Sequence, residues 1–155
     1  IRTSRVHRVT LRDELAALGR YVDIERLRFE ERLNVRFDVP AALHDVEVPH
    51  LLLQPLVENA IKHAIGERSS PSHVVVGARA IGRADGSDAL ELTVRDDGPG
   101  PSPRAVRRGT GKGLEITTAR LAEMYGDQAE FALTAPDGGG ALARIVLPLR
   151  RRTIE

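Results

Sequence analysis

Three clusters of polar residues and glycines have types and spacings that could do chemistry. The first occupies residues 54–63, where Asn59, Lys62 and His63 would lie within one turn of a helix. An amide oxygen is a hard ligand that suits Mg²⁺, and a lysine is a mobile positive charge that suits phosphate. The same residues could be the solvent face of an amphipathic helix, and for this cluster alone that plainer interpretation is favoured.

The second cluster, residues 96–100, reads Asp-Asp-Gly-Pro-Gly and follows a predicted strand. Glycines after a strand let the backbone pass close to a flat ligand, while a carboxylate accepts a hydrogen bond from an amino group such as adenine N6. Asp96 fits that ligand role, whereas we expect Asp97 to be solvated. An ordinary Asp-Gly turn explains the same residues, and alone it is the better explanation.

The third cluster, residues 109–114, reads Gly-Thr-Gly-Lys-Gly-Leu and leads into a predicted helix. Exposed backbone N–H groups next to the positive end of a helix dipole form an anion site, to which Lys112 adds charge. A Rossmann site needs these glycines after the first strand of a parallel βαβ unit, and a Walker-type loop needs its full glycine, lysine and hydroxyl spacing. Neither context is present.

Length and composition limit the classes of protein that could carry these clusters. The 155 residues suffice for one domain with a short extra element, and 41% apolar with 29% charged residues is typical of soluble globular proteins. Acids and bases alternate around a net charge of +1, which disfavours a nucleic-acid binder. The absence of cysteine excludes disulfides and cysteine-based zinc sites.

Apolar periodicity predicts the elements of the first half of the chain. A helix is expected over residues 11–33, with Thr10 as its N-cap and Glu14 near the capping-box position. Alternation predicts a strand over residues 34–39, which ends at Pro40 and is followed by a polar loop. A second helical pattern opens at Pro49 and runs to about residue 65, with Pro55 as a kink or restart.

The second half of the chain predicts two hairpins around one helix. Strands are expected over residues 73–81 and 89–95, and a long exposed loop over residues 96–111. A helix over residues 112–125, capped by Gly126, offers these residues for a buried face: Leu114, Ile116, Ala119, Leu121 and Met124. Residues 129–135 and 141–149 form the closing hairpin. This order predicts an α+β fold, a two-layer α/β sandwich whose mixed sheet is covered on one face by helices.

The order of the three clusters resembles the Bergerat ATP-binding fold, the superfamily of DNA gyrase, a heat-shock chaperone, the histidine kinases and the MutL repair proteins, also called GHKL. The resemblance covers about residues 35–149. Residues 54–63 look like the N box of LytS-type sensor histidine kinases, and the first helix is similar to the segment between their phosphoacceptor and catalytic domains. Matching positions also include Arg120-Leu121, Tyr125-Gly126 and Leu147-Pro148.

The resemblance implies a site for ATP and Mg²⁺. Asn59 would coordinate the Mg²⁺ that bridges the ATP phosphates, Lys62 would contact phosphate and His63 would lie beside the nucleotide. Asp96 would bind adenine N6. The base pocket would be shaped by Gly98 and Gly100, and the phosphates would be wrapped by Gly109, Thr110, Gly111, Lys112, Gly113 and Leu114. Glu58 is a candidate catalytic residue that could orient an incoming histidine or a water, or form a structural salt bridge.

Three features depart from the family pattern. Ile116 stands where an asparagine is usual, Ala141 stands where a threonine is usual, and residues 101–108 make a very short lid. Two alternatives to a histidine kinase therefore stay open: a hydrolysing ATPase or anti-sigma serine kinase of the same fold, and a non-catalytic nucleotide-binding or interaction module. Gyrase-like members carry a general-base glutamate one helical turn before the asparagine, and Pro55 at that position argues against hydrolysis.

The resemblance divides the chain into a linker helix (residues 1–33), an ATP-binding catalytic domain (34–150) and a tail (151–155). None of the five histidines stands in the His-Phe-hydrophobic-Phe-Asn setting of the family's acceptor, and no initiator methionine precedes Ile1. We therefore expect a piece of a longer protein whose acceptor lies upstream, so that the piece binds ATP without autophosphorylating. The implied partners are the phosphoacceptor and dimerisation domain of the same parent, a response regulator and a second copy in a homodimer. The implied location is the cytoplasmic side of a membrane-bound parent.

Overall fold

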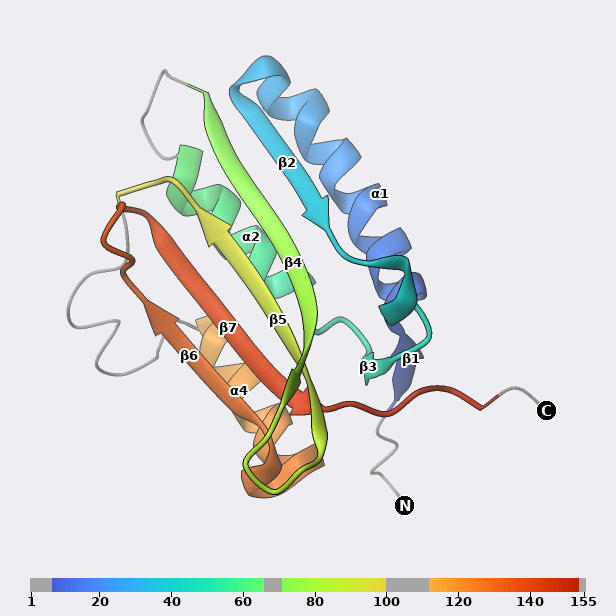
Figure 1. Cartoon of the computed structure of the whole chain (residues 1–155). Coiled ribbons are helices and arrows are strands. Elements are labelled where there is room, and N and C mark those ends of the chain that lie inside the picture. Colours follow the sequence, from blue (N-terminus) through green and yellow to red (C-terminus); the bar gives the residue numbers. More distant parts are fainter. Residues whose placement is uncertain (1–6, 66–70, 100–111, 154–155) are drawn as a thin grey trace.

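A five-stranded mixed sheet with helices on one face forms the framework of the chain (Figure 1). The computed structural model describes residues 7–65, 71–99 and 112–153, without the side chains of residues 112 and 113. The sheet order is β2-β4-β5-β7-β6, with β2 and β4 parallel and the other neighbours antiparallel. The strands are β2 (Leu33–Asp38), β4 (Ser72–Gly82), β5 (Asp88–Asp96), β6 (Glu130–Thr134) and β7 (Ala141–Pro148).

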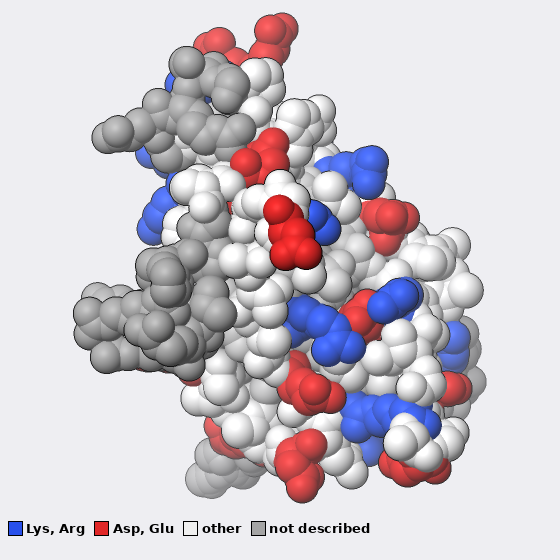
Figure 2. All heavy atoms as spheres, turned by 60° about the vertical axis from the view of Figure 1, so that its left-hand side comes forward, with Lys and Arg blue, Asp and Glu red and all other residues white. Residues whose placement is uncertain are grey.

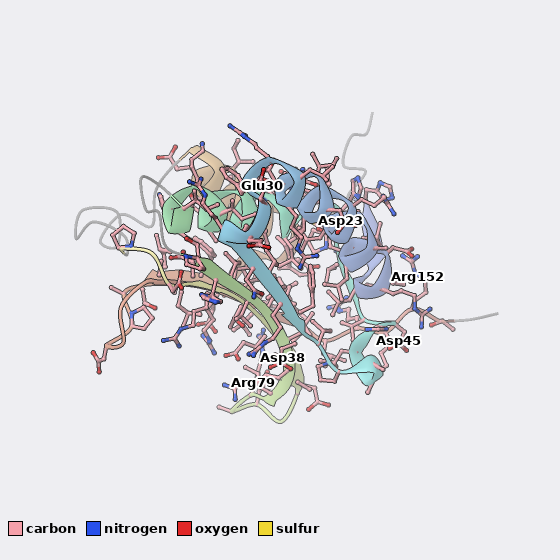
Figure 3. All side chains as sticks on the ribbon, turned by 90° about the horizontal axis from the view of Figure 1, so that it is seen from above. Asp23, Glu30, Asp38, Asp45, Arg79 and Arg152 are labelled. Atoms are coloured by element: carbon pink, nitrogen blue, oxygen red, sulfur yellow. The ribbon has the colours of Figure 1, made fainter. Side chains whose placement is uncertain are left out.

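Three helices cover the sheet: α1 (Leu11–Phe29), α2 (Gln54–Ile65) and α4 (Lys112–Tyr125). Seen from above, they lie on the same side of the sheet, whereas Arg79 lies on the other side (Figure 3). The apolar core fills the space between the two layers. The predicted two-layer α+β fold is therefore confirmed. No helix of the described residues is long and apolar enough to span a membrane.

Helix α1 begins where the sequence predicts and ends earlier. The Thr10 hydroxyl accepts a hydrogen bond from the Asp13 backbone N–H at 3.2 Å, which caps the helix. Glu30 has a φ of 54°, a left-handed conformation that stops the helix at Phe29 rather than near residue 33. A 3-10 turn, η1 (Glu30–Arg32), then leads into β2.

The polar loop predicted after β2 contains two short elements that the sequence does not predict. It holds a 3-10 turn, η2 (Ala41–Leu43), and a short strand, β3 (Glu47–Pro49). Strand β3 pairs antiparallel with β1 (Arg8–Thr10), immediately before α1. Val46 and Val48 are fully buried. Such short strands are stabilised by a partner almost forty residues away, so no local pattern announces them.

Helix α2 begins at Gln54, so the prediction of a helix from Pro49 is wrong. Leu51 has a φ of 59°, which interrupts the helical pattern. Pro55 lies in the first turn, where a proline needs no backbone N–H, so the restart interpretation of Pro55 is confirmed. The preceding turn is held from two sides, because Arg120 of α4 donates to the carbonyl of His50 at 2.6 Å and Glu14 of α1 accepts from Leu51.

Glu14 is a buried carboxylate that fixes the start of α2. Only 3% of its surface is exposed, and it lies on the apolar face of α1 with Leu11, Leu18 and Val22. Its two oxygens accept hydrogen bonds from the backbone N–H groups of Leu51 and Leu53, each at 3.0 Å. Glu14 therefore caps the entry to α2 and plays no part in a capping box of its own helix.

The predicted hairpins and the last helix form as expected, but two residues predicted for the buried face of that helix are exposed. β4 pairs with β5 and β6 with β7, and α4 has the predicted limits. Gly126 has a φ of 61° and starts a closing 3-10 turn, η3 (Gly126–Gln128). Ile116 is 62% exposed, and Ala119 is exposed too. The buried face of α4 consists of Leu114, Thr117 and Leu121.

Several charged side chains outside the core form ion pairs. On the open face of the sheet, buried Glu91 binds Arg79 of β4 and Arg144 of β7. At the end of the chain, Arg151 pairs with Asp45, and Arg152 pairs with Glu47. On the face turned forward in Figure 2, the described acidic and basic side chains are interspersed.

We expect the substitution Glu14→Ala to lower the free energy of unfolding by about 3 kcal/mol, because two buried N–H donors would lose a charged acceptor. Urea denaturation measures this difference. The control Glu123→Ala removes an exposed glutamate of α4 and should change the same quantity by less than about 0.5 kcal/mol. Equal losses in the two variants would contradict the capping role of Glu14.

Candidate functional site

Asp96 is the buried acid at the centre of the candidate site. It is the last residue of β5 and only 4% exposed. One carboxylate oxygen accepts a hydrogen bond from the Gly98 backbone N–H at 2.9 Å, and a backbone hydrogen bond also links the carboxyl group to Ala141. A carboxylate offers about four lone-pair positions, so Asp96 retains capacity to accept a hydrogen bond from a ligand.

Gly98 lies directly against the backbone of α2. A Cβ atom at this position would be 2.6 Å from the carbonyl oxygen of His63 and 2.9 Å from the Cα of Ala64. Such contacts are too short for any side chain, so only glycine lets the segment after β5 pack on the helix. Gly98 therefore joins the second cluster to the first. Its role is this packing contact, which brings Asp96 beside the helix that carries Asn59.

Gly140, between the two strands of the predicted closing hairpin, makes an equally close approach from the other side. Its φ is 78°, and a Cβ atom there would be 1.9 Å from the backbone carbonyl oxygen of Asp96. The next residue, Ala141, is the register partner of Asp96 across β5 and β7. The run of three glycines before β7 hinted at an unusual backbone without indicating which glycine mattered.

The pKa of Asp96 is raised above its ordinary value, mainly because burial disfavours the charged form. The backbone hydrogen bond from Gly98, the nearby His63 and the backbone hydrogen bond from Ala141 lower the pKa in part. The neighbouring Asp97 charge adds a small further rise. A carboxyl group whose pKa is raised by burial and partly lowered by hydrogen bonds is more typical of a ligand-binding position than of an exposed turn.

Asp97 binds His73 instead of facing only water, which corrects the expectation from sequence. Its carboxylate accepts from the His73 backbone N–H at 2.9 Å and lies 2.8 Å from the His73 ring Nδ1. The two side chains are 39% and 56% exposed. Ser72, a neighbour of His73, donates its hydroxyl to the Ala64 carbonyl at 2.8 Å. These bonds fix the beginning of β4 to α2 and to the segment that carries Asp96.

The polar residues of α2 form two adjacent stripes instead of one. Asn59 and His63 are half-buried and four residues apart, on the side where Gly98 contacts the helix. Glu58 and Lys62 are exposed, also four residues apart, and line a groove between α2 and α1. The structure thus places His63 near Asp96, with Asn59 one helical turn before His63, and turns Lys62 and Glu58 toward α1. Gln54 donates to Glu58 at 3.4 Å.

The third cluster lies mostly outside the described residues. Its predicted site residues Gly109, Thr110 and Gly111 lie outside the described residues, as do Gly100 of the second cluster and the predicted lid at residues 101–108. Lys112 and Gly113 begin α4 as predicted, and the Lys112 side chain is also outside the described part. Leu114 is 3% exposed and packs in the core, so its side chain anchors the helix.

The surroundings of Asn59 suit a magnesium ion that is held mainly by phosphate and water. Mg²⁺ in phosphate sites usually takes one or two protein oxygens and completes its shell with phosphate and water. The described residues contain no group of three or more histidine, cysteine, aspartate or glutamate side chains that could hold a metal ion. Asn59 is half-buried, and its side-chain amide contains a hard oxygen of the kind that such a shared site needs.

We expect Gly98→Ala to lower the free energy of unfolding by about 1–3 kcal/mol, because the added methyl group would overlap the backbone of α2. The matched control is Gly82→Ala, since a Cβ atom at Gly82 would meet no atom within 4 Å. Urea denaturation of both variants separates the effect of close packing from the general effect of replacing a glycine. A tolerated Gly98→Ala would contradict the packing contact.

The raised pKa of Asp96 predicts a pH dependence of stability. Between the ordinary pKa of 3.8 and the higher folded value, the folded chain holds a proton that the unfolded chain has lost. The stabilisation from this group is therefore present at low pH and lost as the pH rises through the folded pKa. We expect Asp96→Asn to gain stability relative to the unsubstituted chain as the pH rises from the ordinary pKa of 3.8 through the higher folded pKa. A constant difference over this range would contradict the raised pKa.

Known proteins of similar sequence and structure share this arrangement of elements. The sensor protein LytS of Enterococcus faecalis is 31% identical over 157 residues, which cover 95% of this chain and 26% of LytS. The histidine kinase domain of the blue-light activated histidine kinase of Erythrobacter litoralis EL346 has a TM-score of 0.62 at 26% identity, over 91% of this chain and 62% of that chain. Full-length ShkA in complex with AMPPNP has a TM-score of 0.70 at 20% identity, over 99% of this chain and 33% of that chain.

The chain spans about a quarter of the length of the curated relatives it matches. Over residues 44–151, more than half of its length, it also matches the family model described as histidine kinase-, DNA gyrase B-, and HSP90-like ATPase. That range contains Asn59, Asp96, Gly98 and Gly140, which are the residues that build the site described above. The chain therefore belongs to the family of histidine kinase-, DNA gyrase B- and HSP90-like ATPases.

Proposed function

We propose that this chain is the ATP-binding catalytic domain of a two-component sensor histidine kinase. The observation that carries the proposal is the contact of Gly98 with α2, which brings the buried carboxyl group of Asp96 beside the stripe of Asn59 and His63. In this proposal Asp96 is the acceptor for an amino group and Asn59 is the hard oxygen ligand, the two functions that a nucleotide with a bound metal requires. The similarity to LytS supports a sensor kinase as the parent.

Each site residue has a proposed role. Asp96 accepts a hydrogen bond from the adenine N6 amino group. Its register partner Ala141 has no hydroxyl, so this position leaves space for the base and adds no hydrogen bond of its own. Asn59 would hold Mg²⁺, which would neutralise phosphate charge, and His63 would lie beside the nucleotide. Lys62 reaches phosphate with its long side chain from the neighbouring stripe. The glycine-rich segment before α4 wraps the phosphates with backbone N–H groups.

Catalysis by such a site depends mainly on position and charge. Phosphoryl transfer spreads negative charge over the oxygens of the transferred group, and bound Mg²⁺ neutralises part of that charge. The residues of this chain would hold the base through Asp96 and the metal through Asn59, and these two contacts would orient the nucleotide for transfer. Glu58, exposed on α2 and bonded to Gln54, is positioned to orient an incoming acceptor.

Pro55 supports transfer to a protein acceptor over hydrolysis. It lies in the first turn of α2, one turn before Asn59, where gyrase-like members of the superfamily carry a general-base glutamate. A proline ring has no group that could take a proton from water. We therefore propose that the acceptor is a histidine of the parent protein, outside this chain, and that the same chain does not carry out efficient hydrolysis.

The remaining proposals concern the parent protein. Residues 1–33 would connect this domain to a dimerisation and phosphoacceptor domain, residues 34–150 would form the catalytic unit, and residues 151–155 would be its tail. The parent would act as a homodimer, pass its phosphoryl group to a response regulator and be anchored in the membrane with this domain in the cytoplasm. These proposals rest on the sensor kinases that the chain matches.

Calorimetry with ATP tests the assignment of Asn59 and Asp96. We expect the unsubstituted chain to bind Mg-ATP, and Asn59→Ala to bind it about tenfold more weakly with Mg²⁺ present but little more weakly in EDTA. Asp96→Ala should lose preference for ATP over GTP, because the acceptor for the amino group would be gone. Asn34→Ala, an exposed asparagine of β2, is the matched control.

The outcomes separate the proposal from its alternatives. If the unsubstituted chain bound no nucleotide, the site would be a non-catalytic interaction module. If Asn59→Ala weakened binding equally with and without Mg²⁺, the metal role of Asn59 would be wrong while nucleotide binding would stand. Turnover of ATP to ADP by the isolated chain at a steady rate would contradict the exclusion of hydrolysis.

A further inference from the structure

The pair of His73 and Asp97 lies beside Asp96 and has no role in the proposed nucleotide contacts. His73 is the second residue of β4, and Asp97 follows the last residue of β5. One Asp97 oxygen accepts a hydrogen bond from the His73 backbone N–H at 2.9 Å, and the other lies 2.8 Å from the ring Nδ1. The Asp97 backbone N–H donates to the His73 carbonyl at 3.2 Å. These contacts tie the end of β5 to the beginning of β4.

The backbone that this tie holds is the one that positions Asp96. Asp97 lies between Asp96 and Gly98, which packs on α2 at the carbonyl of His63. On its other side, a Cβ atom at Gly140 would be 3.2 Å from the Cα of Asp97. The backbone of Asp97 is therefore confined between α2 and the start of β7, and its side chain connects it to β4. A shift of Asp97 would move the Asp96 carboxyl group with it.

The strength of the side-chain contact depends on the protonation of the His73 ring. A carboxylate only accepts hydrogen bonds, so Nδ1 must carry a proton to bond with it. A neutral ring meets this condition in one of its two tautomers, whereas a protonated ring always meets it and adds a charge-assisted attraction. Histidine rings take up this proton between about pH 8 and about pH 5. Because both side chains are partly exposed, water screens the attraction and keeps its effect to a few-fold.

Other charged groups surround the pair. Arg36 of β2 and Arg95 of β5 are the register partners of the residue two places after His73, so they lie on the same face of the sheet. Both arginines keep their charge over the whole pH range. His63 of α2 lies near Asp96 and can change charge in the same range as His73. A comparison of variants at one pH removes the contribution of His63, because they share it.

We propose that His73 is a positioning residue of the nucleotide site, and that its protonation strengthens nucleotide binding by holding Asp97 and hence the backbone that carries Asp96. This inference rests on the proposed ATP-binding function and adds to it a dependence on pH. At low pH the charged ring holds the carboxylate of Asp97 more firmly, and at high pH the neutral ring holds it through a single tautomer.

Asp97→Asn is the variant that tests this role most sharply. Its amide oxygen can still accept from the His73 backbone N–H, and its amide nitrogen can donate to Nδ1 of a neutral ring. A protonated ring would instead bring N–H against N–H, so the contact would break as the pH falls. Calorimetry with Mg-ATP on the 155-residue chain measures the consequence. We expect Asp97→Asn to bind within about twofold of the unsubstituted chain at about pH 8, and about fivefold more weakly at about pH 5.5.

Two controls isolate the proton on His73. His73→Asn keeps a side-chain donor and cannot titrate, so in that background Asp97→Asn should change the dissociation constant by the same factor at both pH values. Asp88→Ala removes an exposed aspartate at the opposite end of β5, and should leave the dissociation constant within about twofold of normal at both. Near-normal binding by Asp97→Asn at high pH also shows that this variant folds.

The outcomes distinguish this role from the proposed function. If the unsubstituted chain bound no Mg-ATP at either pH, the proposed ATP-binding function itself would fall. If it bound Mg-ATP and Asp97→Asn weakened binding by the same factor at both pH values, ATP binding would stand and the protonation of His73 would have no part in it. Persistence of the pH dependence in the His73→Asn background would equally overturn the role of His73.

Discussion

The whole site depends on the backbone after β5 lying in direct contact with α2, with no side chain between them. Gly98 permits that contact, and Gly140 permits β7 to approach the carbonyl of Asp96 equally closely. Asp96 is therefore enclosed by two backbones, which explains both its burial and its raised pKa. Without either glycine the carboxyl group would move away from Asn59, and the acid and the amide could no longer face one ligand.

Helix α1 has a structural role beyond that of a connection. Glu14 accepts hydrogen bonds from the two N–H groups before α2, and Arg120 of α4 donates to a carbonyl of the same turn. The start of α2, and with it the position of Asn59 along the helix axis, is thus set by the helices on either side. Helix α1 therefore holds the start of α2 through Glu14.

The sequence predicted those elements whose signals are local. The two hairpins, α4 and the N-cap at Thr10 follow from alternation, periodicity and capping chemistry. The place of Asp96 at a strand end predicts a ligand role, and the structure shows that the residue is buried there. The β1–β3 pair was missed because it joins residues distant in the chain. The start of α2 was placed too early because a left-handed Leu51 has no sequence signature. Glu14 is a carboxylate on the apolar face of a helix, which is a signal for a buried hydrogen-bonding role. Its position near the start of α1 predicts a capping box instead.

A crystal structure of this chain with Mg²⁺ and a non-hydrolysable ATP analogue tests the central claim most directly. The account predicts the adenine amino group within hydrogen-bond distance of the Asp96 carboxylate, and the amide oxygen of Asn59 on the metal ion. The α1–α2 groove should remain free of nucleotide. A nucleotide bound in that groove, or bound elsewhere with Asp96 still contacting only Gly98 and Ala141, would contradict the account.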